Sequence, residues 1–472
     1  MTALGLDVGT TALKGIALAD DGSVLARAER GYPFHTPQPG WAEQDPELWW
    51  DAARLVLDEL GAAGDADGIG LSGQMHGLVA LDSADTVVRP AILWNDQRTA
   101  AECAEIEQRI GLAELIASTG NRALTGFTAP KLLWMRRHEP DLYGRIRSVL
   151  LPKDYVRLRL CGEKAMDVAD ASGTLLFDVA ERRWSSSVLE ALELDEAWLP
   201  RTLESPEVSG AVEGVAVAAG AGDQAAGALG VGVDRPGPAS VVLGTSGVVF
   251  VALEEFAADP QARLHTFCHA VPGAWHAMGV MLSAAGSLRW LRDVAAPGES
   301  FAALVAEAER WEPGAEGLTF LPYLSGERTP HADPDARGAF VGLSVRHDRG
   351  ALVRAVLEGV AYGLRDCLDL LVEVGAVPTI GRVSGGGARS DLWLRIVASV
   401  LELPLERTAA DEGAAFGAAL LGGVAGGVWS GVEEAVAAAV RPTEVVEPVA
   451  DWIEPYREGR ERFRALYPAL QV

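Results

Sequence analysis

The sequence predicts an α/β protein built from two similar halves. Residues 4–18 (LGLDVGTTALKGIAL) and 239–253 (ASVVLGTSGVVFVAL) share one pattern: an apolar segment, a Gly-Thr turn and a second apolar segment. Strand-like and helix-like segments are interspersed along the chain, which is typical of mixed α/β layers. The length of 472 residues favours two or more domains. The sharpest Pro/Gly punctuation in mid-chain, DRPGPA at 234–239, predicts domains of residues 1–236 and 237–472.

In the first half, residues 4–26 read as a β-meander, because a turn at Asp20-Asp21-Gly22 follows the first Gly-Thr turn. A helix is expected next, with Asp45 as its N-cap and Pro46 as its first residue. Its apolar stripe is predicted to run through Leu48, Ala52, Leu55 and Val56.

The second half contains a further glycine cluster, RVSGGGARSDLWLRIVASVL at 382–401. This segment reads as the end of a strand, a glycine turn and the start of a helix. Its apolar residues at helical spacing are Leu392, Ile396, Val397 and Val400.

Charge and composition exclude several classes of partner. The net charge of −26 repels phosphate backbones and anionic lipid surfaces, so we expect neither nucleic acid nor membrane as a partner. The four cysteines form no C-x-x-C pair, which indicates a reducing compartment. The N-terminus lacks the pattern of a signal peptide, so we expect a cytoplasmic protein.

The two Gly-Thr turns suit phosphate groups, because glycine lets backbone N–H groups approach an anion and hydroxyls add donors. Lys14 adds a positive charge near the first turn. One such turn alone is more simply a hairpin, but two copies and the GGG cluster favour phosphate binding. No G-x-x-x-x-G-K-[ST] loop is present, and GIGLSG at 68–73 lacks the preceding strand of a dinucleotide fold.

Two aspartates stand at the ends of apolar runs, Asp7 in GLDVGTT and Asp223 in VAAGAGDQAAG. If the halves face each other, both carboxylates would point into a shared cleft. Two such charges beside a polyphosphate would repel it, so the arrangement predicts Mg²⁺ bound at Asp7 and Asp223. One carboxylate would position the hydrated metal and the other would take a proton from a hydroxyl.

The histidines give weaker signals. GQMHG at 73–77 places His76 between glycines, so we expect an exposed side chain in a loop that contacts a ligand. LHTFCHAVPGAWH at 264–276 contains three histidines and a cysteine, but their spacing matches no standard zinc site.

Several blocks together resemble the FGGY carbohydrate kinases over nearly the whole chain. They are DVGTT, WAEQDPELWW, GQMHG, VRPAILWNDQR, GFTAPKLLWMRRHEP, LPKDYVRLRL, FLPYLSGERTPH, GAFVGLSVRHDRGALVRAVLEGVAY and SGGGARSDLW. The resemblance implies two ribonuclease-H-like domains of the actin type that flank a central cleft, where ATP and a sugar meet. Residues 1–236 would then supply the sugar site and the first phosphate loop, and residues 237–472 the nucleotide site.

The resemblance also implies roles for individual residues. Asp223 is similar to the catalytic base and Asp7 to the Mg²⁺-associated aspartate. The sugar would contact Met75, His76, Asp223 and Gln224, and the ATP phosphates and nucleotide would contact Thr10, Thr11, Lys14, Gly244, Thr245, Ser246, Gly386, Gly387 and Ala388. Within the family, GQMHG and WND favour D-xylulose as the sugar.

Alternatives stay open on the sequence alone. Many members carry asparagine where this chain has Gln224, whose amide reaches one methylene further, so another ketose or polyol is the first alternative. An actin-like, ATP-gated assembly or binding protein is the second. The alanine- and valine-rich helices could supply a homodimer interface or belong to the core.

Overall fold

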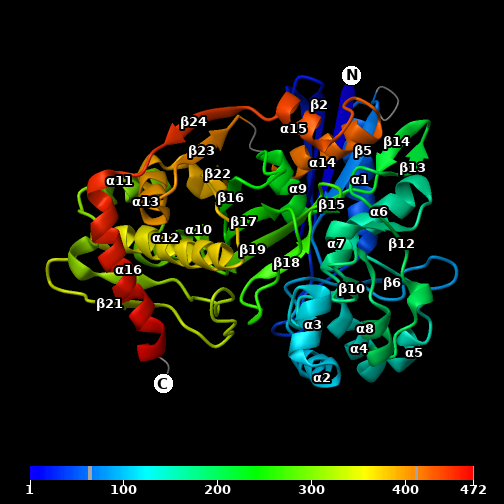
Figure 1. Ribbon diagram of the computed structural model, residues 1–472, viewed down its shortest axis with the longest axis horizontal. Coiled ribbons are helices and arrows are strands. Elements are labelled where there is room, and N and C mark those ends of the chain that lie inside the picture. Colours follow the sequence, from blue (N-terminus) through cyan, green and yellow to red (C-terminus); the bar gives the residue numbers. More distant parts are fainter. Residues whose placement is uncertain (62–65, 410–412, 471–472) are drawn as a thin grey trace.

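Two mixed sheets with the same strand order organise the chain in the computed structural model, which describes residues 1–61, 66–409 and 413–470 (Figure 1). The first sheet runs β3 (Val24–Gly31), β2 (Ala12–Ala19), β1 (Thr2–Val8), β5 (Gly68–Gly73) and β14 (Val215–Ala218), with β13 (Val208–Val212) at its edge and β15 (Ala221–Gly222) also paired with β5. The second runs β19 (Trp275–Met281), β17 (Gly247–Leu253), β16 (Pro238–Leu243), β22 (Ile380–Ser384) and β23 (Leu405–Thr408), flanked by β18 (His265–Cys268) and β24 (Pro442–Val446).

In each sheet the first three of these strands are antiparallel and the next two run parallel to the third. The predicted β-meander and the predicted repetition of strand, Gly-Thr turn and strand are therefore confirmed.

Helices cover the sheets of both lobes. Those of the first lobe are α1 (Pro46–Glu59), α6 (Pro152–Cys161), α7 (Val168–Ser172), α9 (Asp223–Gly230), α14 (Gly413–Ala425) and α15 (Val432–Ala439), together with a helical group of α2 (Ala100–Ile110), α3 (Leu112–Thr119), α4 (Thr128–His138), α5 (Pro140–Tyr143) and α8 (Ser186–Leu192). Those of the second lobe are α10 (Ala285–Ala295), α11 (Phe301–Ala308), α12 (Arg349–Glu373), α13 (Asp391–Leu401) and α16 (Ala450–Leu470). Short strands complete the fold: β4 (Glu43–Gln44), β6 (Val79–Leu81), β7 (Ala91–Ile92), β8 (Ser148–Leu150), β9 (Ala165–Asp167), β10 (Phe177–Asp178), β11 (Arg183–Trp184), β12 (Arg201–Leu203), β20 (Thr319–Leu321) and β21 (Ala339–Val341).

Strand β1 separates two cores, because successive side chains of a strand point to opposite faces. Leu4, Leu6 and Val8 pack with α1 and α6. Gly5 and Asp7 therefore belong to the other face, where a Cβ at Gly5 would lie 2.1 Å from a carbonyl oxygen of α14. Asp7 thus points to the side of the sheet that carries α14 and α9.

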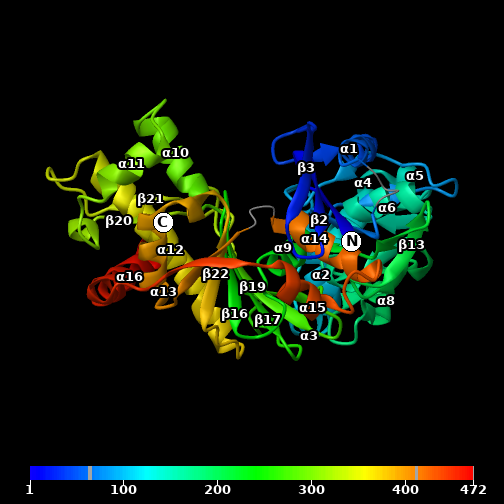
Figure 2. The same ribbon diagram turned by 90° about the horizontal axis from the view of Figure 1, so that it is seen from above.

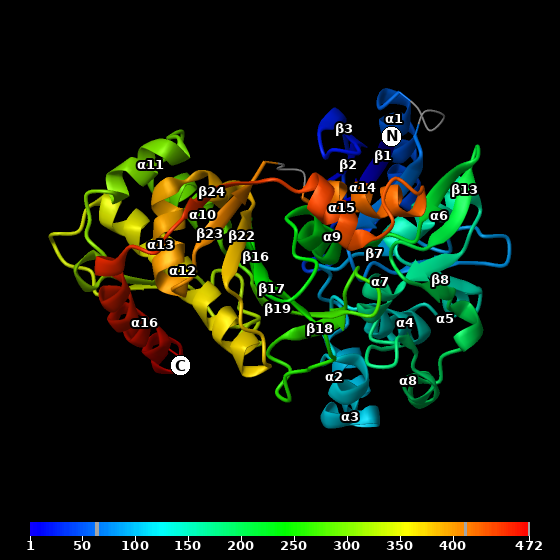
Figure 3. The same ribbon diagram turned by 45° about the horizontal axis from the view of Figure 1, so that its top comes forward.

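Helix α14 comes from the second half of the sequence but packs on the first sheet, beside α9 (Figures 2 and 3). Glycines permit the close approach. A Cβ at Gly70 of β5 would lie 1.7 Å from Ala418 O, and a Cβ at Gly417 of α14 would lie 1.8 Å from Ala226 O of α9. The glycines of GIGLSG therefore belong to a strand that accommodates a helix, rather than to a turn.

Helix α1 begins as predicted, since the Asp45 carboxylate accepts a hydrogen bond from Glu47 N and Pro46 is the first helical residue. The predicted stripe is partly wrong, because Leu55 is 45% exposed. The buried face runs through Trp49, Ala52, Ala53 and Val56. The large ring of Trp49 fills the space under the helix and turns the buried face by one residue.

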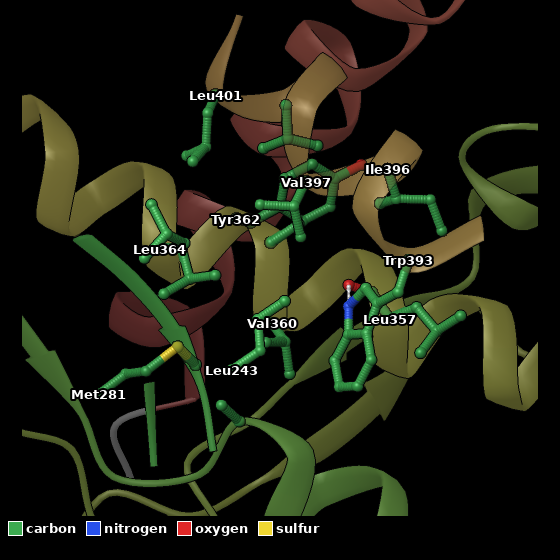
Figure 4. Close-up of a cluster of buried hydrophobic side chains, with 14 of the residues drawn as sticks. Leu243, Met281, Leu357, Val360, Tyr362, Leu364, Trp393, Ile396, Val397 and Leu401 are labelled. Carbon is green, nitrogen blue, oxygen red and sulfur yellow. Dashed lines mark hydrogen bonds between the residues drawn. The ribbon is translucent and has the colours of Figure 1, made fainter. Parts of the chain in front are cut away.

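The core of the second lobe lies among α12, α13 and the end of β16 (Figure 4). Trp393 of α13 donates its indole N–H to Leu357 O of α12 at 3.1 Å. The helix predicted in 382–401 is confirmed as α13, with its four predicted apolar residues buried. Within the described ranges, no helix is long and apolar enough to cross a bilayer.

Candidate functional site

Asp7 and Asp223 stand at the same edge of the first sheet. Asp7 is the penultimate residue of β1, and Asp223 begins α9 directly after β15. Both β1 and β15 run parallel to β5, where Gly73 pairs with Val8 and with Gly222. Because the carboxyl ends of parallel strands meet at one edge, the sheet brings together two aspartates that are far apart in the sequence.

The two carboxyl groups influence each other electrostatically. The pKa of Asp223 is raised to about 7, mainly by burial and in addition by the negative charge of Asp7. Burial also raises the pKa of Asp7 to about 6, against the lowering effect of Lys14. Gln224 Nε2 donates to Asp223 Oδ1 at 3.3 Å. Asp223 is therefore a carboxyl group poised to bind or release a proton near neutral pH.

The donor set fits a magnesium ion that keeps most of its water. Asp7 Oδ1 is buried and has no hydrogen-bond partner among the described residues, so it can accept a ligand. Mg²⁺ prefers oxygen ligands and is commonly held by one or two carboxylates and substrate phosphates. No cluster of three or more His, Cys, Asp or Glu side chains suited to a metal occurs in the described part of the chain. Asp7 and Asp223 could therefore hold a hydrated ion, but not a closed protein cage.

The first Gly-Thr turn, at 9–11, is held by side chains from four other segments. Gln74 accepts a hydrogen bond from Thr10 Oγ1 at 3.3 Å. Trp94 Nε1 donates to Thr10 Oγ1 at 3.0 Å, and Gln44 Nε2 donates to Thr10 O at 3.1 Å. The Tyr32 hydroxyl donates a hydrogen bond to Gly9 O at 2.7 Å. Thr11 and Lys14 are exposed, and Lys14 lies opposite Asp7 in the register of β1 and β2. These hydrogen bonds fix the conformation of the turn, and the exposed side chains of Thr11 in the turn and Lys14 in β2 can reach a ligand.

The second Gly-Thr turn, Gly244 to Ser246, joins β16 to β17 and contacts the GGG cluster. Gly385 has φ 85°, and a Cβ there would lie 2.8 Å from Leu243 O. Only glycine fits this position. The contact places the short turn that contains Gly386, Gly387 and Ala388 directly beside Gly244, Thr245 and Ser246.

A cavity of about 550 Å³ opens beside this turn, between α10, α11 and α13. Gly386 and Gly387 line one wall, and Leu288, Phe301 and Val305 supply apolar surface on the others. A mainly apolar pocket of this size suits a flat aromatic heterocycle.

Met75 and His76 lie close to Asp223. A Cβ at Gly222 would sit 2.8 Å from Met75 Cγ, so Met75 packs directly against the residue before Asp223. His76 Nδ1 lies 2.6 Å from Gly173 O. A carbonyl can only accept, so Nδ1 carries the proton and Nε2 stays an acceptor.

The expectation that His76 is exposed is wrong. Its ring is half-buried and packs edge-on against Phe127, with the ring centroids 4.6 Å apart. Burial lowers the pKa of His76 to about 3, and the charges of Lys131 and Arg328 act in the same direction. The imidazole is therefore neutral and acts as a hydrogen-bonding group.

A buried ionic cluster behind the site was missed from the sequence. Lys153 Nζ lies 2.7 Å from Asp154, 2.6 Å from Asp167 and 3.0 Å from Asp170, and all four side chains are fully buried. Asp170 Oδ1 would lie 3.3 Å from a Cβ at Gly222, which places the cluster beside Asp223. Buried lysines and aspartates occur almost only in such pairs, but nothing in the sequence indicates that LPKDY and MDVAD meet.

Comparisons with known proteins show the family to which the chain belongs. Residues 2–230 match the N-terminal domain of the FGGY family of carbohydrate kinases, and residues 239–426 match its C-terminal domain. The chain is 45% identical to a xylulose kinase of Escherichia coli K12 over 426 residues, which cover 87% of each chain. It is 36% identical to a xylulose kinase of Staphylococcus epidermidis RP62A over 98% of this chain and 96% of the relative.

Solved structures agree on the fold. A xyloylose kinase from Brucella ovis superimposes with a TM-score of 0.94 at 42% identity, covering 100% of this chain and 99% of that one. A xylulose kinase from Rhodospirillum rubrum gives a TM-score of 0.93 at 35% identity, with the same coverage. The predicted α/β fold with two ribonuclease-H-like domains of the actin type is confirmed.

Proposed function

Because the chain belongs to the FGGY family of carbohydrate kinases, we propose that it transfers the γ-phosphoryl group of ATP to the 5-hydroxyl of D-xylulose. The observation that carries the catalytic assignment is the meeting of Asp223, whose pKa is raised to about 7, with Asp7 at one edge of the first sheet. A base with a pKa near the operating pH is well matched to accept a hydroxyl proton.

In this proposal, Asp223 accepts the proton of the 5-hydroxyl as that oxygen attacks the γ-phosphorus in line. Met75 and His76 orient the sugar, since they pack between Gly222 and Phe127. Gln224 holds the Asp223 carboxylate through a hydrogen bond of 3.3 Å. Positioning and electrostatics supply most of the rate of such transfers, so the rigid surroundings matter as much as the base.

ATP and Mg²⁺ are the cofactors of this activity, and Mg²⁺ supplies charge neutralisation for the phosphate oxygens. Asp7 and Asp223 would hold the hydrated ion. Backbone N–H groups and hydroxyls of the two Gly-Thr turns, with Lys14, would bind the phosphates. The cavity beside Gly386, Gly387 and Ala388 would take the nucleoside. Residues 1–236 would thus provide the sugar site and residues 237–472 the nucleotide site.

The test is Asp223→Asn, which keeps the shape of the side chain but removes the base. We expect D-xylulose-dependent ADP release to fall by at least about 10²-fold, while ATP binding measured by calorimetry stays within a few-fold of the wild type. A variant with a near-normal rate would refute the assignment of the base.

A substrate panel tests the sugar. ADP release with D-xylulose, L-ribulose, glycerol and gluconate should be highest with D-xylulose, and release that ignores every sugar would favour an ATP-gated assembly protein instead. A homodimer and a cytoplasmic location remain proposals from the sequence, to be tested by light scattering and cell fractionation.

A further inference from the structure

Arg328, in the loop after β20 of the second lobe, has an unusual environment. Its side chain is half-buried, yet no carboxylate of the described residues lies within 4.0 Å of its guanidinium nitrogens. Glu327, its neighbour, instead accepts hydrogen bonds from Leu282 N and Arg328 N, both at 2.8 Å. Glu327 acts on the charge of Arg328 only from beyond 4.0 Å. A partly desolvated arginine without a contacting counter-charge costs free energy unless solvent or a ligand supplies acceptors.

Side chains from both lobes fix the orientation of this guanidinium. Asn121 Nδ2 donates to Thr119 O and Thr266 O, both at 2.9 Å, so its Oδ1 must face His265 Nδ1 at 2.7 Å. His265 Nδ1 therefore carries the proton and Nε2 is an acceptor. Arg328 Nη1 lies 3.5 Å from that Nε2. Among the residues that the structure describes, His265 is the one hydrogen-bond partner of this guanidinium, so its other N–H groups are available to a ligand.

A continuous wall of rings leads from Arg328 to the sugar site. His265 stacks on Phe267 with a centroid distance of 5.7 Å, and Phe127 packs edge-on against both His265, at 5.9 Å, and His76, at 4.6 Å. The charge of Arg328 lowers the pKa of His76. The pKa of Asp223, in contrast, is shifted by its neighbours Asp7 and Gln224. The order along the site is therefore Asp223, Met75, His76 and then Arg328.

The chemistry of a 2-ketopentose gives this order a meaning. Its five-membered ring closes when the 5-hydroxyl adds to the C2 carbonyl, so a molecule with a free 5-hydroxyl is open-chain and has a free carbonyl at C2. With the 5-hydroxyl at Asp223, the C2 end of the extended chain lies on the far side of His76. Resting on the proposed function, we infer that Arg328 donates hydrogen bonds to the C2 oxygen of the open-chain ketose and so selects that form.

The test is a double-mutant cycle between the protein and the sugar. The variants are Arg328→Ala and Arg328→Lys. The ligand pair is D-xylulose and a 2-deoxypentitol (the pentitol), which has the same configuration at C3 and C4 but a methylene in place of the C2 carbonyl. We expect Arg328→Ala to lower kcat/KM for D-xylulose by about 10- to 100-fold, the value of a hydrogen bond from a charged donor. The inhibition constant of the pentitol and the KM for ATP should change less than about threefold, and Arg328→Lys should restore part of the loss.

Two further measurements separate binding from a structural role. Guanidinium added to Arg328→Ala should recover activity with D-xylulose. His265→Phe removes the acceptor that orients Arg328 but can keep the ring stacking, and it should raise the KM for D-xylulose. The matched control is Arg346→Met, which removes an exposed ion pair with Glu316 in the same lobe and should leave all constants unchanged.

Equal losses for D-xylulose and the pentitol, or no loss for either, would overturn the role of Arg328. Failure of the wild type to phosphorylate D-xylulose would be a different result, because it would overturn the proposed function and the inference with it.

Discussion

Replacing Gly417 by alanine should move Asp223, the proposed catalytic base, without touching its side chain. Gly417 of α14 faces α9, where a Cβ would lie 1.8 Å from Ala226 O, although real Cβ contacts essentially never fall below 3.0 Å. The gap between the helices must therefore open by at least about 1.2 Å. Helix α14 cannot retreat, because its opposite face meets β5 at Gly70, where a Cβ would lie 1.7 Å from Ala418 O.

The displacement therefore falls on α9, whose first residue is Asp223. A misplacement of about 1 Å can cost about 10²-fold in rate, and an overpacked core about 1–3 kcal/mol in stability. We expect Gly417→Ala to lower kcat/KM for D-xylulose by roughly 10²-fold and the free energy of unfolding in urea by about 1–3 kcal/mol.

The matched control is Gly431→Ala. Gly431 has extended backbone with φ −173°, and a Cβ there would meet nothing within 4 Å. Because Gly431 is the N-cap of α15, this variant should lose no more than about 1 kcal/mol and should keep its activity. Wild-type kcat/KM and stability in Gly417→Ala would refute the reasoning, because α14 and α9 would then not be held at the separation that the glycines set.

Two further predictions concern charge. The pKa of Asp223 is raised to about 7, and the base must be ionised to act. We therefore expect kcat/KM, which reports the pKa values of the free enzyme, to fall about tenfold per pH unit below about 7. A flat profile between about pH 5.5 and 7.5 would contradict this. Lys153→Met leaves the carboxylates of Asp167 and Asp170 buried without the cation that they share, while Asp154 keeps its ion pair with Arg157, so urea denaturation at pH 7 should show a loss of about 3–5 kcal/mol. Lys164→Met, which removes an exposed pair with Asp85, should cost less than about 1 kcal/mol, and equal losses in the two variants would be inconsistent with this account.

The features that the sequence predicted well depend on patterns among residues that are close together in the chain. The strand, Gly-Thr turn and strand of each half recur in β1–β2 and β16–β17, because alternating burial and turn glycines act within about fifteen residues. The N-cap at Asp45 and the helix of 391–401 are local in the same sense. The ends of two apolar runs predict that Asp7 and Asp223 meet between facing halves; the two aspartates do come together, but within one lobe, at one edge of the first sheet.

The features that it did not predict depend on contacts between distant segments. Leu55 is exposed because Trp49 occupies the space under α1, and the half-burial of His76 comes from Phe127 and Gly173, about 50 and 100 residues further along the chain. The approach of Arg328 to the proposed sugar site depends on how segments of the two lobes pack together, through His265 and Phe127. No propensity or spacing reports such contacts.

The return of α14 and α15 to the first lobe has a consequence for anyone who tries to divide the protein. The chain passes between the lobes after α9, before α14 and again between α15 and β24. A recombinant piece that stops at residue 236 would leave the glycine-bearing face of β5 uncovered, exposing backbone and apolar surface that invite aggregation. Co-expression of complementary pieces, rather than isolation of either one, is the workable route to a split enzyme.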